Sequence, residues 1–304
     1  MVPSVYRHDR LTLLTKKQIV VLIVAMATVA SLFFAAIFMV FNASAANVLT
    51  VVRPNDIRPI SEVVSGPAGW YETTTGSGSV ELNTDVPYNT AGSAQFSVAD
   101  SASYAELGHY KQLGGTKLAD LASLSYATWQ EVDATKAVSL QLNMDYDTTD
   151  AYNGWQGRMV FEPYRNTDFY GNGVTDGVWQ TWLTLEDDAV WWMTWRDMSS
   201  INPCPQADPC TVSEIMNMFP NIGITTGVSG DALVLKAGSG WSSFVGYADA
   251  PTVAYSANDA QIWDFEPALT MPTTKEQCFK GGWSTYGDAF KNQGACVSYV
   301  VRLE

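Results

Sequence analysis

Residues 138–146, with the sequence VSLQLNMDY, give the clearest indication of the fold. Apolar residues at the even-numbered positions alternate with serine, glutamine, asparagine and aspartate at the odd-numbered positions. Successive side chains of a β-strand point to opposite faces of its sheet, so this pattern is typical of a strand. We therefore expect a strand with one face buried in a core and the other face in solvent.

Shorter segments with strand character occur on both sides of this one, and turn-forming clusters such as residues 75–78 (TGSG) and 166–177 separate them. Many short strands without long helices between them predict an all-β protein, an antiparallel β-sandwich or jelly roll. The expected strands are residues 79–83, 95–98, 157–161, 178–185, 189–195, 232–236, 243–247 and 261–265.

One short helix is expected beside the strands. Thr211 and Glu214 have the spacing of a capping box, the following residues are apolar, and Pro220 would end the helix. We place the sandwich at residues 67–268 and a small appended hairpin or cap at residues 269–304.

Residues 19–41 contain no charged residue, and as a helix their length of ~35 Å would cross a bilayer. Four basic residues and one acidic residue precede them, which predicts a cytoplasmic tail at residues 1–18 and an extracellular remainder. Either this transmembrane helix stays as a signal anchor, or it is a signal peptide cleaved near the small residues 43–45. Residues 42–66 contain Pro54 and Pro59, and they predict a stalk or a first edge strand. The protein would be a single-pass protein of the cell membrane, or secreted if the leader is cleaved.

The composition supports a folded and acidic ectodomain. Hydrophobic residues make up 47% of the chain and charged residues 16%, which is typical of a globular protein. Residues 1–46 hold four of the 17 basic and one of the 31 acidic residues, so the remainder has 13 basic and 30 acidic residues, a net charge of −17. Such a charge repels phosphate backbones, and we expect no nucleic-acid partner.

All four cysteines, Cys204, Cys210, Cys278 and Cys296, follow the hydrophobic segment. Four cysteines allow three connectivities, and we favour Cys204 with Cys210 and Cys278 with Cys296 because each pair closes a short loop. A zinc site is disfavoured, since the spacing does not fit one and His109 is the only histidine after residue 46.

Two groups of motifs carry a resemblance. The C-terminal motifs KEQC (275–278), GGW (281–283) and FKNQGACVS (290–298) resemble a cysteine-bracketed ending of many secreted or surface proteins of bacteria. The preceding region contains the motifs LQLNMD (140–145), VFEPY (160–164), WQTW (179–182), PNIGI (220–224), LKAGSGW (235–241) and GYAD (246–249). With these motifs it is similar to uncharacterised bacterial exported domains, and at the level of fold it resembles the concanavalin A-like and jelly-roll sandwiches of lectins and carbohydrate-binding modules. That resemblance implies glycan binding by analogy.

Five of the eleven tryptophans lie within 17 residues, at Trp179, Trp182, Trp191, Trp192 and Trp195. In a strand, Trp191 and Trp195 would share one face and Trp192 the other. An exposed row of indoles would stack on sugar rings, whereas a buried row would fill the sandwich core. Both interpretations stay open at this point.

An oxygen-rich stretch suggests a cation site. Asp145, Asp147 and Asp150 lie near Asn143 and Asn153, with Asp168, Asn172 and Asp176 further on, and such ligands suit Ca²⁺. The spacing of an EF-hand loop is absent, and turns formed by these side chains would explain the pattern equally well.

The sequence gives little indication of catalysis. Glu162, Glu186, Asp187 and Asp188 are available as a carboxylate pair, but the E-x-D-x-x-E strand signature of sandwich glucanases is absent. A G-x-S-x-G elbow is also absent, and for Asp249 we expect a strand-end hydrogen bond. We therefore expect a non-catalytic carbohydrate-binding or adhesion module whose partner is a glycan or cell-envelope polymer. The alternatives are a structural cell-envelope protein and an atypical glycoside hydrolase.

Overall fold

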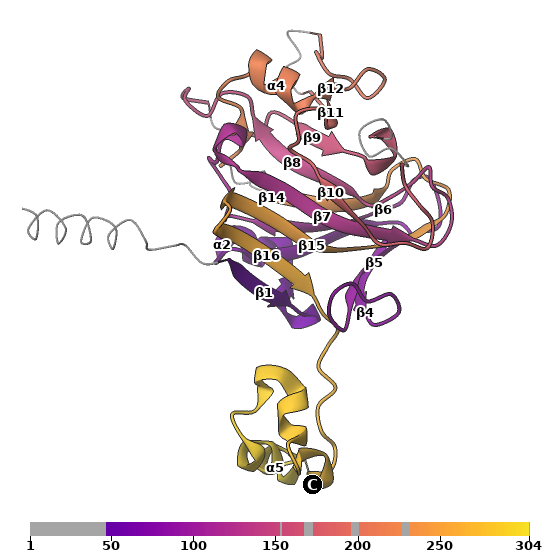
Figure 1. The fold of residues 1–304 in the computed structure, drawn as a ribbon, viewed down its shortest axis with the longest axis vertical. Helices are drawn as coiled ribbons and strands as arrows, with labels where there is room; N and C mark the ends of the chain where they lie inside the picture. The colour runs from indigo at the N-terminus through magenta and orange to yellow at the C-terminus, as the bar shows by residue number, and fades with distance from the viewer. Residues whose placement is uncertain (1–46, 153, 167–172, 196–200, 227–231, 304) are drawn as a thin grey trace, which may run out of the picture. The chain divides into compact units, whose positions relative to one another are not determined.

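The computed structural model describes residues 47–303 except residues 153, 167–172, 196–200 and 227–231 (Figure 1). The expected tail at residues 1–18 and the expected transmembrane helix at residues 19–41 lie outside the described residues. No helix within the described ranges is both long enough and apolar enough to span a membrane.

One of the two sheets in the described part of the chain has seven strands, and its long strand β15 (Phe244–Ser256) pairs with three neighbours. The main order is β1 (Val48–Val52), β16 (Asp259–Phe265), β15, β5 (Ser93–Val98) and β4 (Ser79–Asn83). Strand β7 (Ser123–Gln130) also pairs with β15, and β10 (Gln180–Leu183) pairs with β7.

The second sheet has nine strands and carries the segment at residues 138–146 near its middle. The order is β12 (Cys210–Thr211), β11 (Val190–Met193), β9 (Arg158–Phe161), β8 (Ser139–Asp145), β14 (Ala232–Gly238), β6 (Tyr104–Tyr110), β3 (Gly69–Thr75) and β2 (Ile57–Arg58). Strand β13 (Gly223–Ile224) also pairs with β8.

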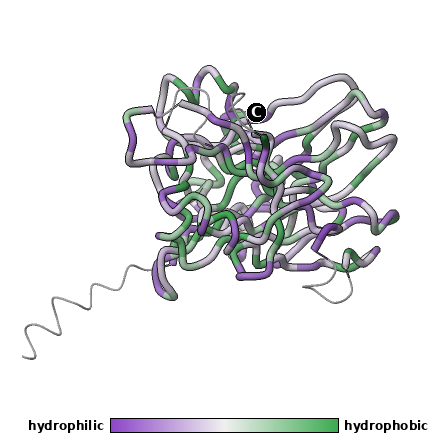
Figure 2. The backbone as a smooth tube through the Cα atoms, turned by 90° about the horizontal axis from the view of Figure 1, so that it is seen from above, coloured by the Kyte–Doolittle hydropathy of each residue, from purple (hydrophilic) through white to green (hydrophobic). Residues whose placement is uncertain are grey.

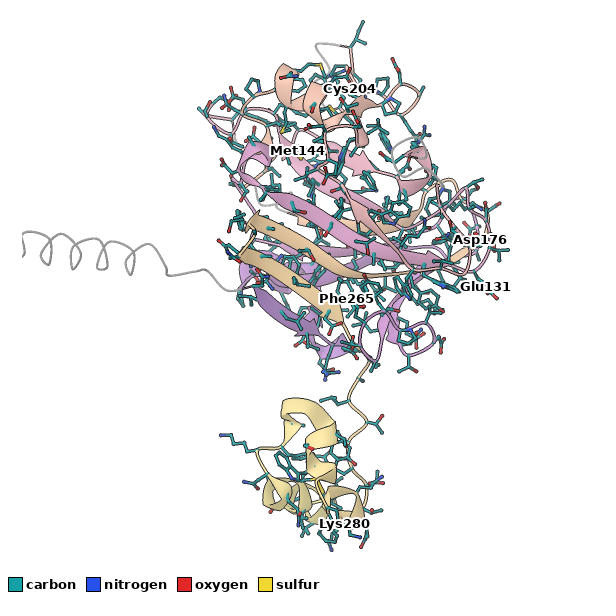
Figure 3. All side chains as sticks on the ribbon, in the orientation of Figure 1. Glu131, Met144, Asp176, Cys204, Phe265 and Lys280 are labelled. Carbon is teal, nitrogen blue, oxygen red and sulfur yellow. A yellow bond between two sulfur atoms is a disulfide. The ribbon has the colours of Figure 1, made fainter. Side chains whose placement is uncertain are left out.

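The two sheets share one hydrophobic core, which defines a sandwich. Leu140 and Met144 of β8 belong to the same buried cluster as Phe96 of β5 and Phe265 of β16. Met144 and Phe265 mark the two sheets in Figure 3, and Figure 2 shows the apolar segments gathered in the interior. Burial of such side chains is the main source of stability of a domain of this size.

The expected alternation along β8 is confirmed on its core side and is wrong on its other side. Leu140, Leu142 and Met144 are fully buried, as expected. The polar residues of the strand are not in solvent, however, because none of Ser139, Gln141, Asn143 and Asp145 is more than 7% exposed. Side chains from neighbouring strands cover them, as described below.

The expectation of an antiparallel sandwich is correct for most strand pairs and wrong for two. Strand β1 runs parallel to β16, and β2 runs parallel to β3, so both sheets are mixed. Residues 48–52 thus form an edge strand of the seven-stranded sheet and residues 57–58 join the other sheet, so these residues are not a stalk. They are followed by a short helix α2 (Ile60–Ser65), whose Val63 packs against Tyr71 and Val234.

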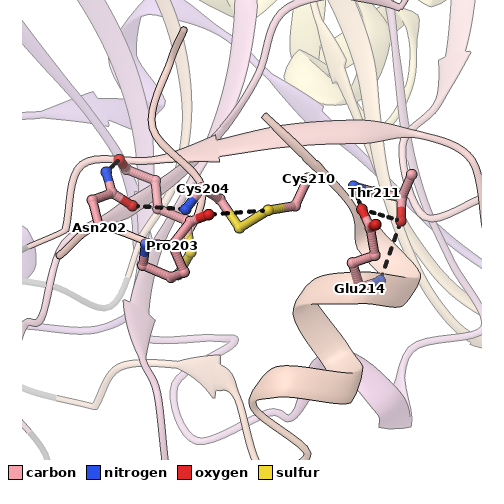
Figure 4. The surroundings of a disulfide bond; sticks show 7 residues. Asn202, Pro203, Cys204, Cys210, Thr211 and Glu214 are labelled. Atoms are coloured by element: carbon pink, nitrogen blue, oxygen red, sulfur yellow. Dashed lines mark hydrogen bonds between the residues drawn. A yellow bond between two sulfur atoms is a disulfide. The ribbon is translucent and has the colours of Figure 1, made fainter. Parts of the chain in front are cut away.

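The expected short helix is present as α4 (Val212–Met218). Thr211 Oγ1 accepts a hydrogen bond from the Glu214 backbone N–H, and Glu214 accepts one in return from the Thr211 backbone N–H, which completes the capping box (Figure 4). The disulfide between Cys204 and Cys210, with a Cα–Cα distance of 5.3 Å, closes the adjacent loop as expected. The chain also contains the short 3₁₀ helices η1 (Pro54–Asp56), η2 (Leu118–Asp120) and η3 (Pro163–Arg165).

The C-terminal segment is closed by the expected disulfide between Cys278 and Cys296, with a Cα–Cα distance of 5.7 Å. It is helical rather than a hairpin: its described residues form η4 (Lys275–Cys278), η5 (Gly282–Ala289) and α5 (Gln293–Val301). Phe290 and Val300 pack on the disulfide in a separate small core, and Lys280 marks the segment in Figure 3.

His109 lies in the sandwich core between aromatic side chains. Its ring contacts Trp70 at 5.2 Å and Trp263 at 4.8 Å between centroids, and burial lowers its pKa to about 4. The unfolded chain would bind a proton at this histidine near pH 6.5, whereas the folded chain would not.

We expect the free energy of unfolding to fall as the pH drops from about 6.5 towards 4, because protons then favour the unfolded state. The His109 contribution to this loss is about 2 to 3 kcal/mol between about pH 7 and about pH 4.5. Urea denaturation of the protein and of a His109→Gln variant at both pH values separates the contribution of His109 from that of the carboxylates, which both proteins share. An equal pH dependence of the two proteins would contradict the expectation.

A cleft on the outer face of the nine-stranded sheet

The strand register brings distant residues together on the side of the nine-stranded sheet that faces away from the core. Trp192 of β11 pairs with Val160 of β9, and Val160 pairs with Gln141 of β8. Gln141 in turn pairs with Val234 of β14. Paired residues of neighbouring strands project to the same face, so Trp192 lies on the polar side of β8.

A cleft of about 420 Å³ opens on this face. Its most prominent lining residues are three half-buried indoles, Trp155, Trp192 and Trp241, together with the phenol ring of Tyr164. The remaining lining residues are mainly polar and are Ser139, Gln141, Arg158, Val160, Glu162, Thr194, Gln206, Lys236, Gly238 and Ser239.

The buried carboxylate of Glu106, on β6, binds two cations at the cleft. Arg158 donates from Nη1 to Oε1 at 2.8 Å and from Nη2 to Oε2 at 3.2 Å, and Lys236 Nζ donates to Oε1 at 2.7 Å. Burial alone would raise the pKa of Glu106, but the hydrogen bonds and charges of Arg158 and Lys236 outweigh it and hold the pKa below its usual range. Glu106 is therefore ionised.

The same arginine organises the polar side of β8. Arg158 Nε donates to Asn143 Oδ1 at 3.0 Å, and Nη1 donates to Gln141 Oε1 at 2.9 Å. Trp155 Nε1 donates to the same Asn143 oxygen at 3.1 Å, so the network also orients an indole of the cleft. Gln141 Nε2 donates to Ser139 Oγ at 3.1 Å. These bonds explain why the polar residues of β8 are buried without being left unpaired.

Glu162 forms a second charged group at the cleft. Its Oε2 accepts from Arg165 Nε at 2.6 Å and from Gln206 Nε2 at 3.4 Å. Gln206 lies in the loop closed by the Cys204–Cys210 disulfide, and its carbonyl accepts from Arg165 Nη1 at 3.0 Å. Burial, and then the charge of Glu162, raise the pKa of the Tyr164 hydroxyl, which stays protonated.

The five clustered tryptophans, for which an exposed row and a buried row were both open, form neither a single exposed row nor a single buried one. Trp182 and Trp191 are buried in the core, where their Nε1 groups donate to Thr128 Oγ1 and to the Thr184 carbonyl, each at 2.8 Å.

The remaining three lie apart from one another. Trp195 packs against Tyr146 at 4.6 Å, and Trp179 packs against Tyr88 at 4.9 Å. Of the five, Trp192 alone lines the cleft, so the predicted separation of Trp191 and Trp192 onto opposite faces is confirmed. The five do not share one binding surface.

The predicted calcium ligands form turns instead of a common site. Asp145 Oδ1 accepts from the Asp147 N–H at 3.0 Å, Asp147 Oδ1 accepts from the Thr149 N–H at 3.0 Å, and Asp150 Oδ1 accepts from the Tyr152 N–H at 2.7 Å. No group of three histidine, cysteine or acidic side chains that could hold a metal occurs among the residues the structure describes. Asn153, Asp168 and Asn172 lie outside them.

The carboxylates considered for catalysis are dispersed. Glu162 lines the cleft, whereas Glu186, Asp187 and Asp188 are exposed in the loop between β10 and β11. Asp249 lies inside β15, next to an irregularity in its pairing with β7, and not at the expected strand end. Its Oδ1 accepts from the backbone N–H groups of Ala250 at 2.6 Å and Phe265 at 3.0 Å. Burial is the main cause that raises its pKa to about 8.

Sequence reasoning missed most of the cleft. Arg158 and Lys236 each lie within a short strand, and Glu106 interrupts an apolar strand at YAELGHY (104–110). A charged residue inside an otherwise apolar strand was the available signal, because such residues are rarely buried unless they are paired. Trp155 and Trp241 lie in loops, and nothing local connects them with Trp192.

Comparisons with known proteins add little to this geometry. No protein-family model matches the chain, and no curated protein matches it. The family 11 carbohydrate-binding module of the cellulase Lic26A-Cel5E of Clostridium thermocellum matches 65% of this chain and 89% of its own, with a TM-score of 0.32 and 9% identity. The glycoside hydrolase domain of Spr0440, Endo-D from Streptococcus pneumoniae R6, matches 62% of this chain and 22% of its own, with a TM-score of 0.26 and 10% identity. Both TM-scores lie below 0.5, and neither likeness carries an argument about function.

We expect Glu106→Gln to lower the free energy of unfolding by about 3 kcal/mol, because Arg158 and Lys236 would lose the charge that balances them. The exposed Glu186→Gln variant removes the same charge elsewhere and should change stability by less than about 0.5 kcal/mol. Urea denaturation of both variants tests this. Equal and small losses would mean that the Glu106 carboxylate contributes no more than a surface charge.

Proposed function

We propose that this protein is a non-catalytic carbohydrate-binding or adhesion module and that its ligand lies in the cleft of the nine-stranded sheet. The observation that carries the proposal is the convergence of three indoles and a tyrosine ring with amide, hydroxyl and charged side chains in one cavity of about 420 Å³. Aromatic faces stack on the apolar faces of sugar rings, while polar groups bind the hydroxyls.

The proposal is supported by how the aromatic rings are held. Trp155 is oriented by its bond to Asn143, and the ring of Trp241 packs on Phe244 at 4.8 Å and faces Tyr164 at 6.4 Å. Rings that are already fixed before the ligand arrives lose little conformational entropy on binding.

We expect Trp192→Ala to weaken glycan binding by about tenfold, since a lost stacking contact costs ~1.5 kcal/mol. Trp179→Ala is the matched control, because Trp179 belongs to the same sequence cluster but packs on Tyr88 outside the cleft. A glycan array identifies the glycan, and titration calorimetry then compares the two variants. Loss of binding in Trp179→Ala with none in Trp192→Ala would overturn the proposal, as would an array without any bound glycan.

The same preparations test the non-catalytic part of the proposal. Glycosidases generally need two carboxyl groups beside the bond they cleave, one of them protonated. Glu162 is the only carboxylate among the described residues that line the cleft, and the nearby Glu106 is held ionised by two cations. Incubation with the bound glycan should release no reducing sugar. Release that Glu162→Gln abolishes would instead indicate a hydrolase.

We also propose that residues 47–304 lie outside the cell, either tethered by residues 19–41 or released by cleavage near residues 43–45. Two disulfides support this, because such bonds persist mainly in oxidising compartments. We expect added protease to remove the sandwich from intact cells, and N-terminal sequencing of the mature protein to distinguish tether from release. Intact protein in the cytosol with four reduced thiols would contradict this proposal.

A further inference from the structure

We infer that the sugar bound in the cleft carries an anionic group, a uronate or a sulfate, and that Lys236, assisted by Arg158, binds this group. The inference rests on the proposed glycan-binding function and specifies its ligand class. It is carried by the distribution of charge in the cleft.

The two cations of the cleft share a single carboxylate. Arg158 and Lys236 both line the cavity, whereas Glu106, which binds both of them, is not among its lining residues. The Glu106 carboxylate therefore lies behind Arg158 and Lys236 as seen from the cleft. One carboxylate balances one cation, and one positive charge remains.

The other carboxylate at the cleft does not cancel this excess. Glu162 is bound by Arg165 at 2.6 Å, so its charge is balanced by a separate cation. Among the residues that the structure describes, Arg158 and Lys236 line the cleft and Arg165 binds its Glu162, so three basic side chains are paired with two carboxylates. In a segment with a net charge of −17, a locally positive site marks a specific preference rather than the general character of the surface.

Lys236 has the donors that such a ligand needs. An ammonium group has three N–H donors, and one of them binds Glu106. The ammonium lies 4.3 Å from the centroid of the Tyr104 ring, which holds it beside the cavity. Arg158 already uses four of its five N–H groups within the network, so it contributes mainly charge. A carboxylate or sulfate would complete the coordination of Lys236 with charge-assisted hydrogen bonds.

The remaining acidic surface limits the kind of anion. Exposed charges are screened beyond ~8 Å at physiological ionic strength, so repulsion from distant acidic residues does not reach far into the cleft. A long run of negative charge along the outside of the protein would still meet acidic residues. The site therefore suits one anionic sugar unit whose ring contacts an indole of the cleft.

The test uses matched oligosaccharides and one lysine variant. Short galacturonate oligosaccharides are compared with their carboxyl-reduced forms, and short chondroitin sulfate oligosaccharides with forms that are desulfated, carboxyl-reduced or both, the last being neutral. The oligosaccharide bound best on the array is compared with its uncharged analogue, and all comparisons use titration calorimetry. Lys236→Met keeps an unbranched side chain as far as Cε and removes the ammonium group, and Glu106 keeps its bidentate bond to Arg158. Lys117→Met is the control, because Lys117 binds Asn221 outside the cleft.

We expect the anionic forms to bind at least about tenfold more tightly than the neutral forms, and Lys236→Met, but not Lys117→Met, to remove that difference. A preference for the carboxyl-bearing or the sulfated form identifies the anionic group. Equal binding of anionic and neutral forms, or a preference that survives in Lys236→Met, would overturn this inference and leave the glycan-binding function standing. Absence of binding to every glycan would overturn both.

Discussion

The outer face of the nine-stranded sheet depends on the bonds between one carboxylate, Glu106, and two cations. Strands β9 and β6 are separated in the sheet by β8 and β14, so Arg158 must extend across both to reach Glu106. On the way it binds Gln141 of β8, and Lys236 of β14 reaches the same carboxylate. The network therefore ties four adjacent strands together on the face that the hydrophobic core does not touch.

This network explains why the polar side of β8 is buried. Alternation of apolar and polar residues along a strand predicts only that its two faces differ, and the polar face is usually exposed to solvent. Here Gln141 and Asn143 accept hydrogen bonds from the Arg158 side chain, while Ser139 donates to the Lys236 carbonyl and accepts from Gln141. Covering charged groups in this way is stable only when each one is paired, and the ion pairs of Glu106 with Arg158 and Lys236 meet that condition.

The sequence predicted the elements better than their assembly. Local alternation and turn residues located β4, β8, β16 and α4 within a few residues, because these signals are contained in short segments. The partners of a strand are not local. Glu106 and Lys236 are 130 residues apart, and only the pairing of β6 with β14 brings them together. A cleft built from such pairs could not be read from the order of residues.

The tryptophan cluster shows that residues close together in the sequence can lie apart in the fold. Trp182 and Trp191 are close in sequence but belong to different sheets, and both point into the core. The period of two separates Trp191 from Trp192 correctly, since that rule concerns neighbouring residues on one strand. Trp192 lines the cleft together with Trp155 and Trp241, which come from loops elsewhere in the sequence. A high density of aromatic residues in sequence predicts burial at least as well as it predicts a binding surface.

The disulfide of the sandwich lies where regular structure is least able to hold the chain. At this edge of the nine-stranded sheet, β11 has four residues and β12 has two, and such short strands contribute few hydrogen bonds. The Cys204–Cys210 bond and the capped helix α4, whose Val212 and Ile215 are buried in the core, fix this edge instead. Between the two cysteines lies Gln206, which binds Glu162 and whose carbonyl binds Arg165. The covalent constraint therefore acts on the rim of the cleft, and a rim fixed before binding spares the ligand the entropic cost of ordering it.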